Sequence, residues 1–135
     1  MPHFIKRFRE WLSVKSSLDT ATHKPPLFRE REVWWGSVGE NVGVEISGKG
    51  HHLVRPVLIL RKLDAFSFIG LPTTSTSRAG SWFINLKIRD LDTTVILSQV
   101  RHFDYRRMEN LMITISDEDF TRVKEKFTRL ISGLK

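Results

Sequence analysis

The spacing of apolar residues predicts a helix at the start of the chain. Residues 3–18 follow the pattern of an amphipathic helix, with apolar side chains near one face and charged side chains on the other. We expect this helix to pack on its own domain, although a basic amphipathic helix can also lie on a membrane surface. A Pro-Pro pair then stops the helical pattern, so residues 19–28 are predicted to be a linker. The apolar residues near the packing face are Phe4, Phe8, Trp11 and Leu12.

From Glu32 the pattern changes to that of short strands rich in apolar and β-branched residues. Asp64 and Ala65 form a turn, so the second and third strands should pair as a hairpin. Several short strands at this spacing predict a closed or nearly closed small barrel in a mainly β fold. The predicted strands are Glu32–Val38, Arg55–Lys62, Phe66–Leu71, Trp82–Ile88, Thr93–Leu97 and Leu111–Ile115.

A second helix is predicted at the C-terminal end of the chain. Ser116 is a strong N-cap candidate, and three acidic residues follow it where they complement the helix dipole. Gly133 is placed to end the helix. We expect the apolar face to pack against the core, and its residues are Phe120, Val123, Phe127, Leu130 and Ile131.

Composition narrows the setting in which the protein works. The chain has 135 residues with 40% hydrophobic content, which fits one domain with a real core. It has no cysteine and no long apolar run, so we expect a soluble cytoplasmic protein that does not enter a membrane. The 22 Lys and Arg residues exceed the 15 Asp and Glu residues, for a net charge of +7. This excess suits a polyanionic partner such as RNA, or it serves solubility alone.

Several common catalytic motifs are absent or incomplete. Residues 43–50 nearly spell a phosphate-binding P-loop, but Gly50 replaces the Ser or Thr and no helix follows, so we reject nucleotide binding. The glycines instead suggest a mobile cationic loop. The five histidines lack metal-ligand spacing, and nothing marks convergent carboxylates, so we expect no metal and no cofactor. His102 is a candidate catalytic base, with a solvated or structural role as the alternative.

A set of polar residues remains at the predicted strand ends. Arg55 comes just before an apolar strand, and Thr73 and Thr74 follow the strand that pairs with it. Because the hairpin turn is at the other end, these residues should meet at the open end of the hairpin. An arginine beside hydroxyls can clamp a phosphate; the alternative is a surface arginine beside ordinary turn hydroxyls. The complete set is Glu45, Arg55, Thr73, Thr74, Ser75 and Gln99.

These residues also carry a resemblance to a known family. In order and spacing, the motifs over about residues 29–132 resemble the MazF/PemK toxins, and the C-terminal helix fits as well. The resemblance divides the chain into an N-terminal extension, residues 1–28, and a barrel domain, residues 29–135. The motifs are Arg31–Gly36, Gly43–Glu45, Gly48–Gly50, Arg55–Leu60, Gly70–Thr74 and Val95–Arg101 with Asp104 and Arg107.

The resemblance implies a small SH3-like β-barrel with an N-terminal and a C-terminal helix, usually a homodimer. It implies metal-independent cleavage of single-stranded RNA to 2′,3′-cyclic phosphate and 5′-hydroxyl ends, and a cognate antitoxin with an acidic disordered tail. The essential arginine and threonine of the family match Arg55 and Thr74. Its acidic loop residue matches Glu45, and its glutamine matches Gln99. The further substrate-binding candidates are Lys49, Thr73, Ser75, Arg101 and His102.

Two other functions remain open at this stage. The same barrel occurs in gyrase poisons of the CcdB type, which act by blocking another protein and lack the arginine–threonine pair. A catalytically silent module that binds RNA or protein is the other alternative, and it would bind RNA with a steep salt dependence but without cleavage.

Overall fold

A computed structural model describes residues 7–133 and places seven strands, two α-helices and two short 3₁₀-helices in them. The strands are β1 (Glu32–Ser37), β2 (Val54–Lys62), β3 (Ser67–Thr74), β4 (Phe83–Ile88), β5 (Leu91–Ile96), β6 (Arg101–Asp104) and β7 (Met108–Thr114). The helices are α1 (Phe8–Thr20), α2 (Asp117–Ser132), η1 (Leu97–Gln99) and η2 (Tyr105–Arg107).

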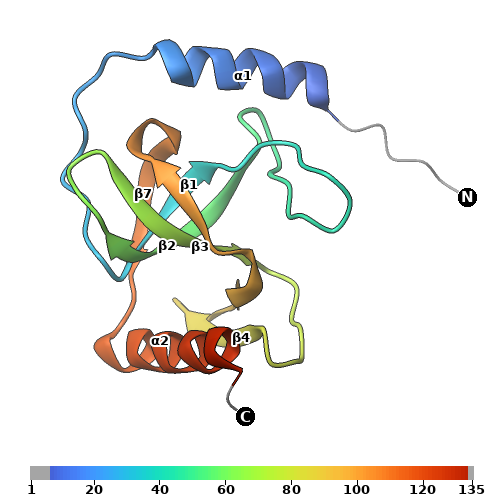
Figure 1. Ribbon diagram of the computed structural model, residues 1–135, viewed down its shortest axis with the longest axis vertical. Helices are drawn as coiled ribbons and strands as arrows, with labels where there is room; N and C mark the ends of the chain where they lie inside the picture. The colour runs from blue at the N-terminus through green and yellow to red at the C-terminus, as the bar shows by residue number, and fades with distance from the viewer. Residues whose placement is uncertain (1–6, 134–135) are drawn as a thin grey trace, which may run out of the picture.

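The strands form one curled antiparallel sheet in the order β4-β5-β3-β2-β1-β7. β3 pairs with β6 along its first half and with β5 along its last two residues, so it bends from one part of the sheet into the other. Within residues 7–133 no pairing joins β4 to β7, so the sheet is a half-barrel that stays open. The predicted fold class, a mainly β SH3-like barrel with two helices, is confirmed (Figure 1).

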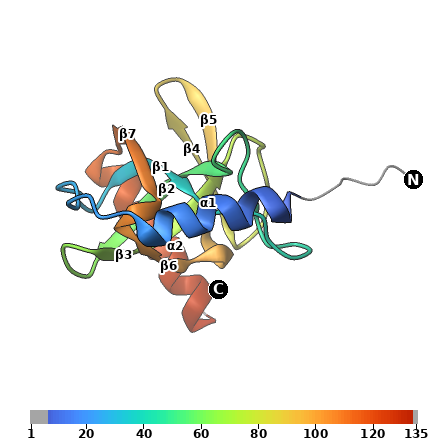
Figure 2. The same cartoon turned by 90° about the horizontal axis from the view of Figure 1, so that it is seen from above.

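Alternation along the central strands places apolar side chains on both faces of the sheet. In β2, Leu58 belongs to the core cluster under α2, whereas Val57 and Ile59 belong to the cluster on the other face. α2 covers the first cluster with Phe120 and Val123. α1 lies on the opposite side of the molecule from α2, across the other face (Figures 1 and 2). The barrel therefore has helices on both sides of one sheet.

The C-terminal helix forms as predicted. The Ser116 hydroxyl accepts a hydrogen bond from the Asp119 amide at 3.1 Å, and Gly133 ends the helix in the left-handed conformation at φ 73°. The Ser116 cap satisfies a backbone donor that has no partner within the helix, and Gly133 adopts positive φ without a Cβ clash.

The N-terminal helix begins at Phe8 and ends at Thr20, two residues beyond the predicted end, and the predicted residues 3–6 lie outside the described part. Of the three predicted apolar contacts within it, only Trp11 is buried; Phe8 and Leu12 are 48% and 66% exposed. The prediction that Phe8 and Leu12 pack against the domain together with Trp11 was therefore wrong. No helix within residues 7–133 combines the length and apolar character needed to span a membrane.

The strand predictions were accurate in the centre of the sheet and less so at its ends. The β2–β3 hairpin is confirmed, but β3 continues through Pro72 to Thr74, and β7 begins at Met108 rather than Leu111. β6 was missed because its four residues, Arg-His-Phe-Asp, include only one apolar side chain and show no clear alternation.

Candidate functional site

The β2–β3 register places Arg55 and Thr74 on the same face of the sheet. The β2–β3 pairing ends with Val57 opposite Pro72. Arg55 and Thr74 each lie two residues beyond this pair, so alternation along the strands places both on the face of Val57 and Pro72. Residues directly opposite in an antiparallel pair share a face, with Cβ atoms roughly 4.5–5.5 Å apart. β1 continues this row with Gly36, which lies opposite Arg55 and has no side chain to cover it. Arg55 and Thr74 therefore both lie at the end of the hairpin away from its turn, and their joint action on a ligand stays a prediction.

The Arg55 side chain is half-buried and held by the β1–β2 loop, residues 38–53. Its Nε donates a hydrogen bond to the Ser47 carbonyl. Within residues 7–133 no other acceptor bonds the guanidinium, so both terminal nitrogens remain available to a ligand. Burial lowers the pKa of Arg55 from its usual value, because the charged form loses hydration. A cation already stripped of part of its water interacts more strongly with an incoming phosphate.

The adjacent threonines have different surroundings because side chains alternate along β3. Thr74 is half-buried, and its hydroxyl oxygen accepts a hydrogen bond from the Thr76 amide at 3.3 Å, which leaves the hydroxyl proton to donate. Thr73 is 1% exposed and donates to the Pro56 carbonyl at 2.9 Å. Thr73 therefore points away from Arg55 into the structure, and the expectation that it contacts a ligand does not fit its position.

Two further arginines lie on the same face. Arg101 in β6 lies opposite Gly70, which shares the face of Thr74, and its guanidinium stacks 4.9 Å from the centre of the Phe103 ring. Burial lowers the pKa of Arg101, and the nearby Glu45 partly opposes this. Burial also lowers the pKa of Arg107, as does the charge of Arg101. Two half-buried cations that repel each other form a site suited to an anion.

A groove of about 510 Å³ runs beside this face. Glu45 and Arg101 line it together with Gln99 and Pro72. Gln99 bonds the β1–β2 loop twice: its Oε1 accepts from the Ile46 amide at 2.6 Å, and its Nε2 donates to the Val44 carbonyl at 3.2 Å. Gln99 thus holds the loop along the groove. Arg55 does not line this groove, but it bonds the Ser47 carbonyl, next in the chain to Ile46, which does.

Of the remaining predicted residues, His102 lies apart from Arg55 and Thr74, whereas Lys49 and Ser75 are on loops next to them. His102 lies opposite Ile69, on the other face of β3, and is exposed. Its charge makes a small contribution to the lowered pKa of Asp64 at the hairpin turn, the end of the hairpin away from Arg55. A role for His102 as the base does not fit this position. Lys49 and Ser75 are exposed on loops, and neither side chain has a bonded partner in residues 7–133.

Arg107 is the site residue that the set of candidates missed. Its Nη1 donates to the Ser37 carbonyl at 2.9 Å, and its guanidinium lies 5.5 Å from the Trp11 ring centre. The only signal in the sequence was its place at the end of the family motifs. The neighbourhood of Arg101 depends on the short strand β6, which the pattern did not predict.

Single carboxylates lie near two of the arginines, Glu45 near Arg101 and Asp104 near Arg107. Within residues 7–133, no three His, Cys, Asp or Glu side chains lie close enough together to hold a metal ion. The chemistry of the described site is therefore that of guanidinium and hydroxyl donors.

Fold and site together define a small SH3-like barrel protein with a groove lined by Arg101 and Glu45 and a half-buried arginine, Arg55, at the end of a central strand. Residues 29–131 match the family described as PemK-like, MazF-like toxin of type II toxin-antitoxin system. The chain belongs to this family and is a MazF-like toxin of a type II toxin–antitoxin system. No curated protein sequence matches the chain significantly.

Solved structures of similar fold come from the same group of toxins. MazF from Deinococcus radiodurans has a TM-score of 0.61 at 18% identity, covering 82% of this chain and 99% of its own. The Mycobacterium tuberculosis toxin MazF-mt6 has a TM-score of 0.58 at 12% identity, covering 76% and 97%. A mycobacterial endoribonuclease in complex with its cognate antitoxin has a TM-score of 0.57 at 13% identity, covering 78% and 95%. At these identities the likeness supports the fold.

Proposed function

We propose that the protein is a metal-independent endoribonuclease that cleaves single-stranded RNA. The observation that carries this proposal is the placement of Arg55 and Thr74 on one face at the end of the β2–β3 hairpin. A guanidinium fork with free terminal nitrogens and a hydroxyl donor are suited to a phosphate that gains negative charge.

In the proposed reaction, the 2′-hydroxyl oxygen of a nucleotide forms a bond to the adjacent phosphorus, and the bond from phosphorus to the 5′-oxygen breaks. The 2′-hydroxyl loses its proton to water, and the departing 5′-oxygen gains one from Arg55, directly or through water. The proton released to water then returns to Arg55. The products are a 2′,3′-cyclic phosphate and a 5′-hydroxyl, with no net change in protons. The reaction involves no metal and no cofactor.

Arg55 and Thr74 divide the work of charge stabilisation. The terminal nitrogens of Arg55 contact the non-bridging oxygens in a bidentate manner, while the Thr74 hydroxyl donates to one of them. The lowered pKa of Arg55 also makes its proton easier to donate to the 5′-oxygen than that of a fully hydrated guanidinium. Preorganised donors of this kind stabilise the transition state more than the ground state.

The remaining basic residues bind the RNA on either side of the cut. Arg101 and Arg107 are half-buried close to one another and suit a neighbouring phosphate. Glu45 beside Arg101 is an acceptor for base amino groups along the groove. Lys49 and Ser75 extend the contact from the loops. Residues 39–54 and 75–81 set the cleavage motif.

A cognate antitoxin with an acidic disordered tail is the proposed protein partner. A chain of net charge +7 with half-buried arginines, one of which, Arg101, lines the groove, attracts an acidic segment, which would fold on binding and exclude RNA. We also propose that the toxin acts as a homodimer in the cytoplasm.

Incubation of the purified protein with a long single-stranded RNA in EDTA tests the proposed activity. Wild type should cut at defined sites and leave cyclic phosphate ends. Arg55→Ala should reduce the rate by about 10²–10³-fold, the effect of losing a preorganised oxyanion donor. Arg61→Ala is a matched control, because Arg61 lies in the same strand but its side chain is 71% exposed.

Two outcomes would contradict the proposal. If Arg55→Ala cleaved at the wild-type rate, the assignment of the site would be wrong. If the wild type bound RNA without cutting it, or neither bound nor cut it, a binding module or a gyrase-poison-like function would replace the nuclease.

A further inference from the structure

The β1–β2 loop passes between the N-terminal helix and the proposed catalytic arginine. Figures 1 and 2 show it running beside the first turns of α1. Its own backbone is held by a hydrogen bond from the Gly48 amide to the Gly39 carbonyl at 2.7 Å. The loop therefore has one side that faces α1 and another that faces Arg55 and Gln99.

On its outer side, the loop is bound by the first turns of α1. The Arg7 Nη1 donates to the Gly50 carbonyl at 2.7 Å, and the Arg7 amide donates to the Glu40 carboxylate at 2.9 Å. Trp11 packs directly on Gly39: a Cβ added at Gly39 would lie 2.2 Å from Cε2 of the indole. Gly39 also has φ +87°, so both its conformation and its contact with Trp11 require glycine.

On its inner side, the same loop supplies the partner of Arg55. The Ser47 carbonyl accepts the Nε–H of Arg55, and Gln99 fixes the backbone of Val44 and Ile46. A long arginine side chain loses rotamer freedom when it is fixed, and a partner at Nε fixes it while leaving the terminal nitrogens to the ligand.

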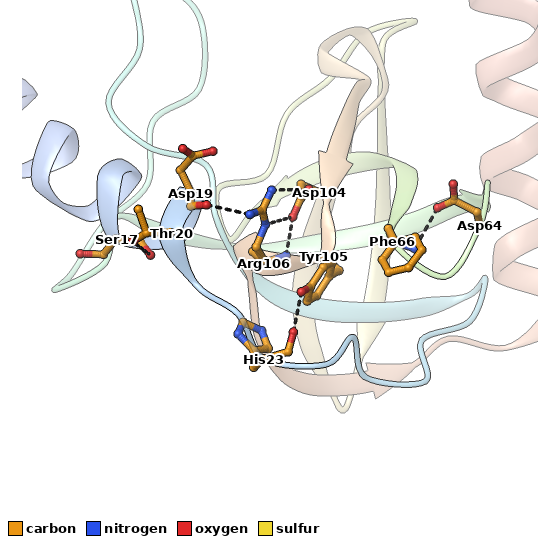
Figure 3. Close-up of polar contacts among 9 residues, drawn as sticks. All are labelled: Ser17, Asp19, Thr20, His23, Asp64, Phe66, Asp104, Tyr105 and Arg106. Carbon is orange, nitrogen blue, oxygen red and sulfur yellow. Dashed lines mark hydrogen bonds and ion pairs between the residues drawn. The ribbon is translucent and has the colours of Figure 1, made fainter.

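The other end of α1 is attached to the sheet through η2. Arg106 forms an ion pair with Asp104 at 2.9 Å and donates from Nη1 to the Asp19 carbonyl at the end of the helix at 2.7 Å (Figure 3). The Tyr105 hydroxyl donates to the His23 carbonyl in the segment that follows (Figure 3). α1 is thus fixed at one end to η2 and contacts the loop at the other.

We propose that Trp11 and Arg7 are positioning residues for the reaction: α1 holds the β1–β2 loop so that the Ser47 carbonyl orients the Arg55 guanidinium. This inference rests on the proposed nuclease function for its effect on rate. The family match covers residues 29–131, so α1 adds this support from outside the matched region.

The rate at which the Arg55 Nε proton exchanges with water, measured by NMR on the full chain, tests without any RNA whether α1 orients the Arg55 guanidinium. We expect Trp11→Ala and Arg7→Ala to speed this exchange, together with that of the Gly48 amide, by about five- to tenfold, the size of one net hydrogen bond. Trp11→Phe keeps a ring over Gly39, so in this variant both protons should exchange nearly as slowly as in the wild type. Arg9→Ala and Leu12→Ala, at exposed positions on the same helix, should leave both exchange rates unchanged.

Single-turnover cleavage of RNA by the same variants tests the effect on the reaction. The maximal rate should fall by about five- to tenfold in Trp11→Ala and Arg7→Ala, while the half-saturating enzyme concentration stays within about twofold. Within residues 7–133, the hydrogen bonds of Arg7 reach the loop and its own helix alone. Arg7→Ala therefore tests the inference even if Trp11→Ala fails to fold.

The outcomes separate this inference from the proposed function. Unchanged Arg55 exchange in a folded Arg7→Ala protein, or an equal change in Arg9→Ala, would overturn the support by α1. Faster exchange with a wild-type rate of cleavage would overturn the positioning role. A wild type that does not cleave RNA would refute the nuclease, while the exchange measurements would still decide whether α1 orients Arg55.

Discussion

Thr73 and Thr74 are neighbours in β3, but their side chains lie on opposite faces of the sheet. The Thr73 hydroxyl is buried and bonded to the Pro56 carbonyl, whereas the Thr74 hydroxyl lies on the face of Arg55 with its proton free to donate. The same chemical group therefore has a structural role at one position and a proposed catalytic role at the next. This difference follows from the alternation of a strand, not from the residue type.

Substitution of each threonine by valine should separate these roles. Thr74→Val should reduce the cleavage rate by about 10²–10³-fold with little change in the melting temperature. Thr73→Val should leave the Pro56 carbonyl unpaired and lower the free energy of unfolding by about 1–3 kcal/mol, with little effect on the rate of the folded protein. Cleavage assays and thermal unfolding of both variants provide the check; the reverse pattern would show that the two faces have been assigned wrongly.

Sequence reasoning reached some site residues and missed others for a physical reason. The juxtaposition of Arg55 and Thr74 followed from one turn at Asp64, because a hairpin fixes which residues meet at its open end. The contacts of Gln99 depend on the path of the β1–β2 loop, and those of Arg107 depend on η2, the end of β1 and α1; no periodicity encodes either. His102 was misplaced because the strand that carries it was not predicted, so its face could not be assigned.

Among the elements, η2 has the clearest structural role, since it joins α1 to the sheet. Asp104 accepts from the Arg106 amide and pairs with the Arg106 guanidinium, which in turn holds the end of α1 (Figure 3). The side-chain hydrogen bond from Arg106 is the main cause that lowers the pKa of Asp104, and the backbone bond adds to it. The charged carboxylate is therefore favoured in the folded state.

The stability contributed by Asp104 should depend on pH in a defined direction. A carboxyl group with a lowered folded pKa contributes above its unfolded pKa of about 3.9, and the contribution is lost as the pH falls through the folded value. Asp104→Asn should lower the urea midpoint at neutral pH, and its difference from the wild type should shrink as the pH falls below about 4. Asp92→Asn, at an exposed position in β5, is the control. A difference that grew on acidification would contradict this account.

The elements were predictable where packing follows a simple period. β2 and α2 have strong apolar patterns, and α2 has both its Ser116 cap and its Gly133 end, so their positions were correct. α1 was harder because its attachment uses one tryptophan and several polar contacts rather than an apolar stripe. A helix attached by such contacts has no regular apolar pattern, so its packing partners could not be predicted from its sequence.

At the scale of the whole molecule, the two helices lie on opposite sides of the sheet (Figure 1). Three half-buried arginines, Arg55, Arg101 and Arg107, belong to the sheet and η2 in a chain of net charge +7. The excess of positive charge alone was compatible either with a role in solubility or with a polyanionic binding partner. The clustering of three partly desolvated guanidinium groups on one face favours the polyanion, and no count of charges along the sequence could show it.

Binding of RNA should therefore depend steeply on salt. With 2′-O-methyl RNA, which lacks the attacking hydroxyl, the plot of log affinity against log salt concentration should lose about 0.7 of its slope in Arg101→Gln, the share of one phosphate contact to a single strand. Arg129→Gln, at an exposed position on α2, should have little effect. Equal losses of slope in the two variants would indicate that RNA binds to the protein surface without preference for the face that carries Arg101.

The most direct test of the central claim is a double-mutant cycle on the single-turnover rate in EDTA with Arg55→Ala and Thr74→Val. Because both residues are proposed to act on one phosphoryl group, the double variant should be scarcely slower than Arg55→Ala alone. Independent effects that multiply in the double variant, or wild-type rates in both single variants, would contradict the claim that the guanidinium and the hydroxyl stabilise the same transition state.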